Sequence, residues 1–481
     1  MSPNAKSNNG TQASSPANKG ILKLALPNII TNITVPLLGM VDTAIVGHLG
    51  QSQLGAIAIG TQIFNLIYWN FGFLRMGTSG FTAQAYGARR LDEAVRIFIR
   101  AITIALAIAL ALILLQYPIA LLSKLIFNGS AGVISMALSY FFVRIWAAPA
   151  TLGLYAIKGW FIGMQNPKLP MWIAIFINLV NIGCSLLFVC VFHWDIRGVA
   201  LGTVIAQYSG LAVGLFFVIT RYGKLFSRSA HVPVGIPSHS AIIPVGNFQF
   251  SIFNFQFLKD SLQWKDLRHF FRVNGDIFLR TVCLAAVFTF ITSESGRISD
   301  EILAVDNLLM QFFMLFSYIM DGFAYAGESL VGRYIGAKDR PSLVSTVRRL
   351  LLWGLLLTLL FTIVYALFGS DILRIFSDKQ EVIDAASPFL FWTLIIPVCG
   401  FSAFLFDGIF VGATASRTMR NSMFIATALF FALYYILLTT YHSPLTTYHW
   451  NNILWLSFML YLAARGLTQA AMLRRSVYSK A

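Results

Sequence analysis

The chain has 481 residues, of which 57% are hydrophobic and only 11% are charged, and its mean hydropathy is +0.72. This composition is too apolar for a soluble enzyme or a soluble binding domain and is typical of a protein that crosses a membrane many times as helices. The net charge of +16 would indicate nucleic-acid binding only if the basic residues gathered on a soluble face, so their placement along the chain decides what they mean.

Residues 1–20 are polar and lack the apolar core of a cleavable signal peptide, so we expect a disordered cytoplasmic tail. A helix needs roughly 20 apolar residues to cross a bilayer. Twelve spans of that kind follow the tail, at about residues 22–48, 54–86, 98–122, 134–160, 170–192, 199–220, 272–293, 302–334, 350–369, 386–412, 420–440 and 450–473. The expected fold class is therefore an all-α polytopic membrane protein with twelve transmembrane helices.

The first span carries a charged residue inside its apolar run. A carboxylate in hydrocarbon costs about 2.5–3.5 kcal/mol on insertion scales and normally faces a bundle interior or a watery cavity, where it has a role. Asp42 is such a residue, and Pro36 precedes it by less than two turns. Because proline lacks an N–H and its ring clashes with the preceding turn, the helix is free to bend at Pro36. The pair predicts an ion-binding acid on a bendable helix.

The basic residues follow the topology of the spans. With the N-terminus inside, the cytoplasmic segments hold most of the Lys and Arg residues, and the outside loops hold only Lys124, Arg197, Arg297, Arg374 and Lys379. This asymmetry is what the positive-inside rule predicts for a prokaryotic inner-membrane protein with both termini in the cytoplasm. It accounts for the net charge without a nucleic-acid partner.

An internal repeat runs through the chain at an offset of 249 residues. Matching positions include Leu54 with Leu303, Gln62 with Gln311, Gly87 with Gly336, Gly159 with Gly408, and Gly163 with Gly412. Such repeats are typical of secondary transporters. We expect two pseudo-symmetric six-helix lobes, an N-lobe at 21–220 and a C-lobe at 272–473, joined by a cytoplasmic linker at 221–271 and followed by a cytoplasmic tail at 474–481. The linker contains an uncharged insert at 229–258, a surface β-hairpin or a disordered excursion.

Four segments resemble one transporter family. PNIITNITVPLLGMVDTAIVGHLG, GFTAQAYGARR, QFFMLFSYIMDGFAYAGESLVGRYIGAKD and FDGIFVGATASRTMRNSM are similar to the DinF branch of the multidrug and toxic compound extrusion (MATE) family. The resemblance implies a V-shaped, twelve-helix exporter with two lobes around a central cavity. Its members exchange protons or sodium for bulky organic compounds, so small organic molecules and the lipid bilayer are the expected partners, with no cofactor and a monomeric state.

Carried over by position, Asp42 matches the cation-coupling acid of the family's first helix. In the fifth span, relatives resemble N-L-V-N-x-x-x-D, whereas this chain has Ser185 where many members place a second acid. The site is then one carboxyl group with neutral oxygens, from Asn178, Asn181, Ser185 and Thr203. Hard cations prefer several oxygen ligands, so the missing acid favours protons and leaves sodium open. The amides and hydroxyls could equally serve as contacts between helices.

Other charged residues are candidates for the cavity or its gates. Asp276 and Arg280 are spaced i, i+4, which predicts a self-neutralising pair on one helix face. The acids of the eighth span could line the cleft or pair with Arg75, Arg280 or Arg333; they are Asp306, Asp321 and Glu328. Lys158 and Asp407 occupy equivalent positions of the two halves, and we expect them to pair across the pseudo-axis and close the cytoplasmic gate.

Several chemistries find no support in the sequence. The seven His residues have no metal-site spacing, the four Cys residues lie in apolar runs without metal or disulfide spacing, and no phosphate-binding loop occurs. We therefore expect no metal and no enzyme activity. The expected function is export of cationic or amphipathic organic compounds in exchange for protons, with sodium as the other ion. A flippase for a lipid-linked precursor is the alternative, and it would need a strongly cationic cavity; a structural scaffold would not need Asp42.

Overall fold

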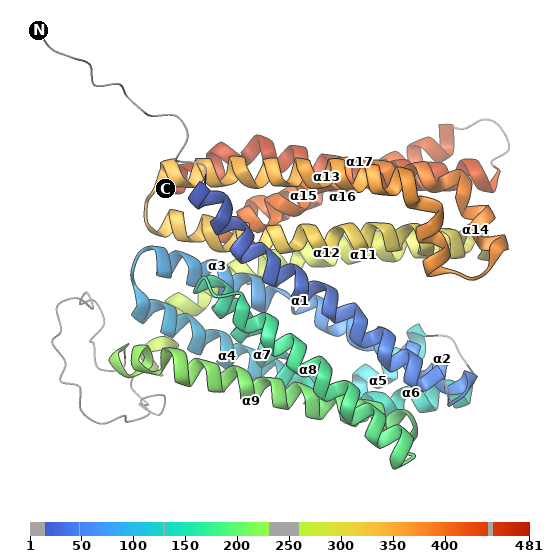
Figure 1. The fold of residues 1–481 in the computed structure, drawn as a ribbon, viewed down its shortest axis with the longest axis horizontal. Helices are drawn as coiled ribbons and strands as arrows, with labels where there is room; N and C mark the ends of the chain where they lie inside the picture. Colours follow the sequence, from blue (N-terminus) through green and yellow to red (C-terminus); the bar gives the residue numbers. More distant parts are fainter. Residues whose placement is uncertain (1–14, 48, 128–129, 230–258, 441–445) are drawn as a thin grey trace, which may run out of the picture.

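The computed structural model describes residues 15–47, 49–127, 130–229, 259–440 and 446–481, and in these it consists of helices joined by short turns (Figure 1). The first half comprises α1 Ser15–Gly47, α2 Gln51–Asn70, α3 Phe73–Gly87, α4 Leu91–Leu114, α5 Gln116–Ile126, α6 Ala131–Arg144, α7 Ala148–Gly163, α8 Lys168–Leu186 and α9 Asp195–Ser229. The second half comprises α11 Trp264–Ile298, α12 Asp300–Gly336, α13 Arg340–Phe376, α14 Gln380–Ala386, α15 Leu390–Gly412, α16 Ser416–Thr440 and α17 Thr447–Ser476. Twelve of the helical stretches in these residues are long and apolar enough to span a membrane, which confirms the number and order of the spans.

Some expected spans are interrupted. The second span bends between α2 and α3 at Phe71 and Gly72, where the helical hydrogen-bond pattern shortens to a turn. The third was expected to run to residue 122, but α4 ends at Leu114 and α5 begins after Leu115. Pro118 gives the physical reason, because it lacks the N–H that would bond to the carbonyl of Leu114 and its ring crowds that carbonyl.

The ends of the lobes also differ from the expected boundaries. Helix α1 begins at Ser15, inside the segment expected to be a disordered tail. Helices α9 and α11 extend into the expected linker, to Ser229 and from Trp264, and the insert at 230–258 lies outside the described residues. The C-terminal segment is docked, since Lys480 Nζ donates to the carbonyl oxygen of Ala413 at 2.8 Å.

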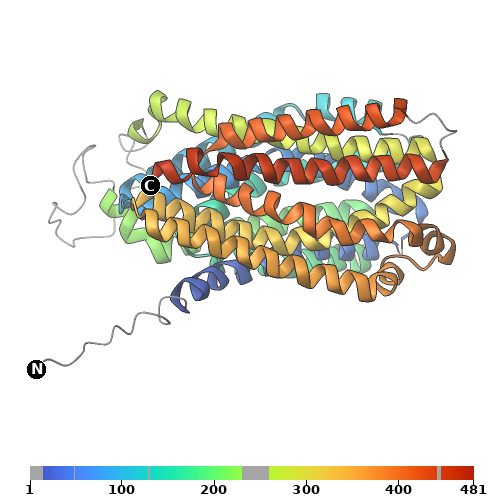
Figure 2. The same ribbon diagram turned by 90° about the horizontal axis from the view of Figure 1, so that it is seen from above.

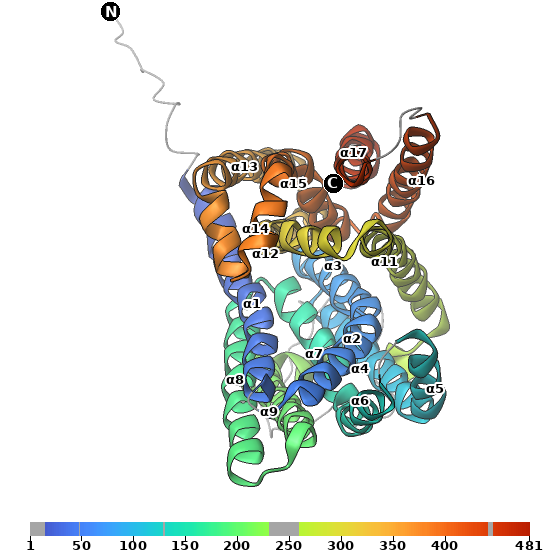
Figure 3. The ribbon, with the colours of Figure 1, turned by 90° about the vertical axis from the view of Figure 1, so that its right-hand side faces the viewer.

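The helices run along one common direction and divide into two lobes (Figures 1 and 2). The view along the bundle shows α2–α9 on one side and α11–α17 on the other, with α1 along one edge and reaching both (Figure 3). Each side has apolar cores of its own: buried residues of α11–α17 form one cluster, joined by Ile21, Leu24 and Ala25 of α1, and the first half holds two others. In Figure 1 the ribbons of the lobes lie together at the end that carries both termini, here called the basic end, and diverge toward the opposite end.

The 249-residue repeat is expressed as equivalent helix contacts. In the N-lobe, Gly159 of α7 packs directly on the backbone carbonyl of Arg75 in α3. In the C-lobe, Gly408 of α15 packs in the same way on the carbonyl of Ala324 in α12, and both positions are shifted by 249. Close approach of this kind between membrane helices requires residues without a side chain, which explains why the repeat retains glycine at both places.

The lobes meet at the basic end through a contact with its own two-fold symmetry. Gly87 of α3 lies against the carbonyl of Arg333 in α12, and Gly336 of α12 lies against the carbonyl of Gln84 in α3. These four positions form two pairs related by the same 249-residue offset. Reciprocal contacts of this type are those of an isologous interface, so the two halves of one chain meet as the subunits of a dimer would.

We expect Gly408→Ala to destabilise the C-lobe. The added methyl group would overlap the Ala324 carbonyl, and overpacking of this kind typically costs about 1–3 kcal/mol. Gly275→Ala in α11 is the matched control, because nothing lies within 4 Å of an added Cβ there and alanine favours a helix by about 0.5–1 kcal/mol over glycine. The free energies of unfolding of both variants in detergent test the packing; equal values would contradict it.

Candidate functional site

Asp42 lies in the second half of α1 and is buried, with 8% of its surface exposed. Its Oδ1 accepts a hydrogen bond from Ser185 Oγ of α8 at 3.4 Å. That long contact is the only side-chain hydrogen bond to Asp42 that we find within the described residues, and no ion pair reaches it there. A buried carboxylate with so little compensation is costly when charged, so its environment favours binding of a proton or a cation.

Two further predicted residues lie beside this pair. Asn181 is one turn before Ser185 on α8, and its Nδ2 donates to Thr203 Oγ1 of α9 at 3.0 Å. The amide oxygen of the same side chain, Asn181 Oδ1, is buried and accepts no hydrogen bond from the described residues. Gly202 allows α9 to approach, because an added Cβ would lie 2.9 Å from Ser185 Oγ. Asp42, Ser185, Asn181 and Thr203 thus converge where α1, α8 and α9 meet.

Asn178 has a different position from the other four. Its Nδ2 donates to the backbone carbonyl of Thr34 in α1 at 2.7 Å, two residues before Pro36. The amide therefore holds α8 to α1 next to the proline. Of the five residues predicted for the ion site, the structure brings four together and assigns Asn178 to the helix contact.

The sequence analysis missed a basic residue beside the acid. Arg144, at the end of α6, lies within electrostatic range of Asp42 without forming an ion pair with it. Its guanidinium donates to Tyr140 Oη at 2.5 Å and lies 4.8 Å from the centre of the Phe64 ring. An arginine inside an apolar span is itself a functional signal, and it sits within the expected fourth span at 134–160, so that rule could have found it.

The contacts of helix α1 pass from the C-lobe to the N-lobe just before Pro36. Asn32 Nδ2 donates to the carbonyl oxygen of Tyr318 in α12 at 3.1 Å, so the first half of α1 is bound to the C-lobe. Two residues later Thr34 is bound to α8 of the N-lobe, as described above. A second proline, Pro27, also lies inside the helix. The predicted bending position therefore falls where the contacts of α1 pass from one lobe to the other.

The C-lobe holds a buried charge cluster around Asp407 of α15. Its carboxylate accepts hydrogen bonds from Arg280 of α11 and Arg465 of α17, and from Gln469 Nε2 at 3.1 Å. The expected pairing of Asp407 with Lys158 across the pseudo-axis is therefore wrong. Lys158 stays in the N-lobe on α7, near Arg75, because the C-lobe arginines are closer and saturate the carboxylate. Arg465, inside the last span, was also missed.

The expected i, i+4 pair of Asp276 and Arg280 is wrong as well. Asp276 instead accepts from Ser416 Oγ at 2.8 Å and from Arg420 at 2.6 Å, both on α16. Asp276 and Arg280 each bond to a neighbouring helix rather than to each other, because each side chain points into a contact between helices. Asp276 therefore links α11 to α16 at the basic end.

The three candidate acids of the eighth span have three different surroundings in α12. Asp306 is buried and accepts from Ser295 Oγ at 2.5 Å, Asn451 Nδ2 at 2.9 Å and Trp455 Nε1 at 2.7 Å, and it forms no ion pair with an arginine among the described residues. Asp321 lies within electrostatic range of Arg75 and of the Asp407 cluster and has no hydrogen-bond partner within the described ranges.

Glu328 makes an ion pair between the lobes. Arg75 of α3 lies 3.3 Å from its Oε2 and stacks 4.0 Å above the ring centre of Tyr325. This was one of the alternatives that the sequence left open. Glu328 lies five residues before Arg333 in α12, and Arg75 lies nine residues before Gln84 in α3, so the pair is deeper in the bundle than the isologous contact. Gln165 Nε2, which donates to the Ser329 carbonyl at 2.8 Å, adds another link. The basic end is therefore closed by side chains as well as by backbone contacts.

Toward the opposite end, a groove separates the lobes. It has a volume of about 870 Å³ and lies between α2 and α4–α5 on one side and α11 and α16 on the other. Its walls are mostly apolar, and Leu66, Phe71, Phe278 and Phe290 are among them. In the described part of the chain, no group of three His, Cys, Asp or Glu side chains is placed to hold a metal.

Comparison with known proteins agrees with this architecture. The MatE family model matches residues 27–187 and 277–436, one segment in each lobe. The chain is 35% identical over 463 residues to DNA damage-inducible protein F of Escherichia coli K12, covering 95% of this chain and 92% of the relative. It is 24% identical over 372 residues to the probable multidrug resistance protein NorM of a Synechococcus strain, covering 76% and 74% of the two chains.

Solved structures share the fold. A multidrug resistance MATE transporter in an outward-facing conformation superposes with a TM-score of 0.80 at 16% identity, covering 96% of both chains. A MATE transporter crystallised in a bent conformation gives 0.79 at 16% identity, again over 96% of each. Two lobes related by a repeat, a buried carboxyl group on the first helix and the sequence matches lead to one assignment. The chain belongs to the multidrug and toxic compound extrusion family, in the DinF branch, and is a membrane transporter rather than an enzyme.

Proposed function

We propose that this protein is a secondary antiporter of a prokaryotic inner membrane that exports cationic or amphipathic organic compounds in exchange for protons. Both termini then lie in the cytoplasm, since the basic residues gather at the end of the bundle that carries them. The resistance-related name of the NorM relative supports the substrate class, and the apolar groove between the lobes suits amphipathic molecules.

The observation that carries the proposal is the contrast between Asp42 and two fully compensated acids of the C-lobe, Asp306 and Asp407. Asp306 has three hydrogen-bond donors, and Asp407 has two arginines and an amide. Asp42 has one hydroxyl at 3.4 Å and an arginine that is bound elsewhere. A carboxyl group with saturated partners has no reason to change its protonation state, whereas one without them can alternate.

Helix α1 supplies the mechanical link in this proposal. When Asp42 is charged, Arg144 attracts it and Ser185 donates to it, which holds the second half of α1 on the N-lobe. A proton entering from the open side removes that charge and weakens both interactions. The second half of α1 is then free to bend at Pro36, while Asn32 keeps the first half on the C-lobe. The shift changes how α1 packs on the N-lobe and releases the substrate outward.

Sodium remains the alternative coupling ion. The free oxygen of Asn181 and the hydroxyls of Ser185 and Thr203 are neutral oxygen ligands beside the single carboxylate, and hard cations accept such ligands. The lipid-linked precursor flippase is disfavoured, because the charges between the lobes are mixed in sign: Arg75 and Lys158 lie beside Asp321 and Glu328.

Dye efflux from proteoliposomes, with proton and sodium gradients imposed separately, tests the proposal. We expect an inward proton gradient to drive efflux without sodium and without ATP, and the rate to rise as the external solution is made more acidic. Efflux that follows only the sodium gradient would replace the coupling ion. Efflux that requires ATP and ignores both gradients would contradict the antiporter class.

A further inference from the structure

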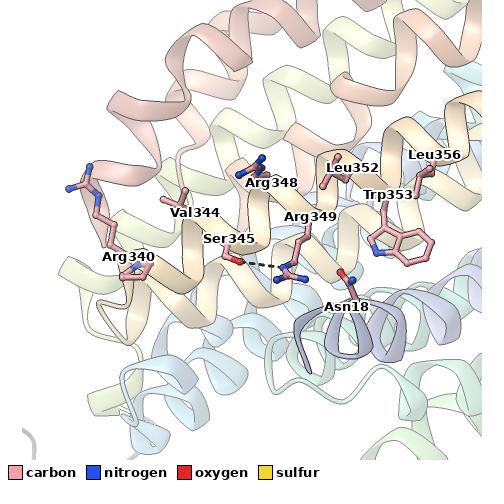
Figure 4. Close-up of a pocket in the computed structure, with 10 residues that line it drawn as sticks. Asn18, Arg340, Val344, Ser345, Arg348, Arg349, Leu352, Trp353 and Leu356 are labelled. Carbon is pink, nitrogen blue, oxygen red and sulfur yellow. Dashed lines mark hydrogen bonds between the residues drawn. The ribbon is translucent and has the colours of Figure 1, made fainter. Parts of the chain in front are cut away.

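A pocket outside the two lobes opens at the basic end, between the start of α1 and the first turns of α13 (Figure 4). Its volume is about 790 Å³. Asn18 lies on the α1 side, and the remaining lining residues come from α13. This pocket belongs neither to the Asp42 site nor to the groove between the lobes.

The part of the pocket formed by the first turns of α13 is basic. Arg340, Arg348 and Arg349 line it, and Arg349 Nε donates to Ser345 Oγ at 3.3 Å (Figure 4). No carboxylate lines the pocket, and within the described ranges neither Arg340 nor Arg348 forms an ion pair. The nearby Asp339 is used for capping, since its Oδ1 accepts from the backbone N of Ser342 at 3.1 Å. Hydrogen bonds from the side chain and then from the backbone N–H of Ser342 hold the pKa of this carboxyl group below the usual range. The guanidinium groups of Arg340 and Arg348 therefore remain available to an external anion.

The part of the pocket farther along α13 is apolar. Its residues follow α13 in two rows of four-residue spacing: Arg340, Val344, Arg348, Leu352 and Leu356 in one, and Pro341, Ser345, Arg349 and Trp353 in the other. Residues spaced by four share a helix face. Because a helix rises about 1.5 Å per residue, the arginines of these rows lie in the first two to three turns and the apolar side chains lie about 6–12 Å deeper. Leu352 and Leu356 are exposed to the surroundings of the bundle, which in a membrane are acyl chains.

We propose that this pocket binds an anionic phospholipid from the cytoplasmic leaflet, with the phosphate on the arginines and one acyl chain along Trp353, Leu352 and Leu356. Arginine binds phosphate oxygens through two parallel hydrogen bonds, and basic pockets between helices on the cytoplasmic side suit anionic head groups. A free phosphate ion would contact only the arginines of the pocket and would leave its apolar residues uncovered. The lipid touches both α13 and the α1 residue Asn18, so it also holds the first half of α1 on the C-lobe. This inference does not depend on the coupling ion or on the exported compound.

Binding of phosphatidylglycerol to the delipidated, full-length protein in detergent, measured by native mass spectrometry, tests the proposal. We expect the wild type to bind phosphatidylglycerol more tightly than phosphatidylcholine. R340Q/R348Q should weaken phosphatidylglycerol binding about thirtyfold, the equivalent of about 1 kcal/mol for each arginine, with phosphatidylcholine binding unchanged. The matched control is R89Q/R90Q, which removes two exposed adjacent arginines at the same end of the other lobe.

Each other outcome contradicts the proposal. Equal weakening by the control variant would mean that binding follows the net charge of the basic end rather than this pocket. If inorganic phosphate displaced phosphatidylglycerol at a concentration similar to that of the lipid, the pocket would be a site for free anions. Equal affinity of the wild type for the two lipids would exclude an anionic lipid site altogether, and this comparison needs no variant.

Discussion

Replacing Asp42 with asparagine is expected to reduce proton-driven efflux to the background rate of protein-free liposomes. Asparagine has nearly the shape of a protonated aspartate but cannot exchange a proton, so α1 would lose the charge change that alternates its contacts with Ser185 and Arg144. The rate of the wild type should increase as the external pH falls, because protonation of the carboxyl group is then favoured, while the variant should show no dependence on pH. Efflux of a fluorescent cation from proteoliposomes, at fixed internal pH, measures both effects.

Asp384→Asn is the matched control for this experiment. Asp384 is an exposed carboxyl group of α14, at the same end of the bundle as Asp42 but outside the site. We expect it to keep the wild-type rate and its pH dependence. Substrate binding by Asp42→Asn should weaken, since the change mimics the protonated state, which releases the substrate in the proposed mechanism. Unchanged proton-driven efflux in the Asp42 variant would remove the residue from the coupling mechanism.

The largest effect on stability is expected at Asp407. Asp407→Ala would leave Arg280 and Arg465 buried without a counter-charge, and breaking a buried ion pair in this way costs about 3–5 kcal/mol. Arg465 is only 2% exposed, so water cannot replace the lost carboxylate without rearrangement of α17. The free energy of unfolding in detergent, from a denaturant titration, measures the loss.

An exposed ion pair of the same lobe provides the comparison. Asp371 and Arg374 of α13 lie 3.8 Å apart with about two thirds of each side chain exposed, and pairs of this kind contribute little. Asp371→Ala should therefore leave the stability unchanged. Equal effects of the two substitutions would contradict a structural role for the cluster. Partial recovery in a variant that also replaces both arginines with methionine would support it, because the uncompensated charges would then be gone.

The sequence by itself determined the number and order of the spans, the repeat and the position of the coupling candidate. These features are local: a span is apolar along its own length, and Asp42 stands out inside such a span whatever surrounds it. The 249-residue offset was also readable, because the close contacts of Gly159 and Gly408 tolerate no other residue. The interruption at Pro118 could have been read from the proline and was not.

Tertiary structure alone decided which charges are partners and where α1 changes lobes. An acid in hydrocarbon must find compensation, but its partner depends on how each helix is rotated and on which helix packs beside it. For this reason Asp276 bonds to Arg420 on another helix instead of Arg280 on its own, and Asp407 bonds to Arg465, 58 residues away in the chain. The predicted bending position at Pro36 was placed in the same way, since only packing shows that α1 is bound to the C-lobe at Asn32 and to the N-lobe from Thr34 onward.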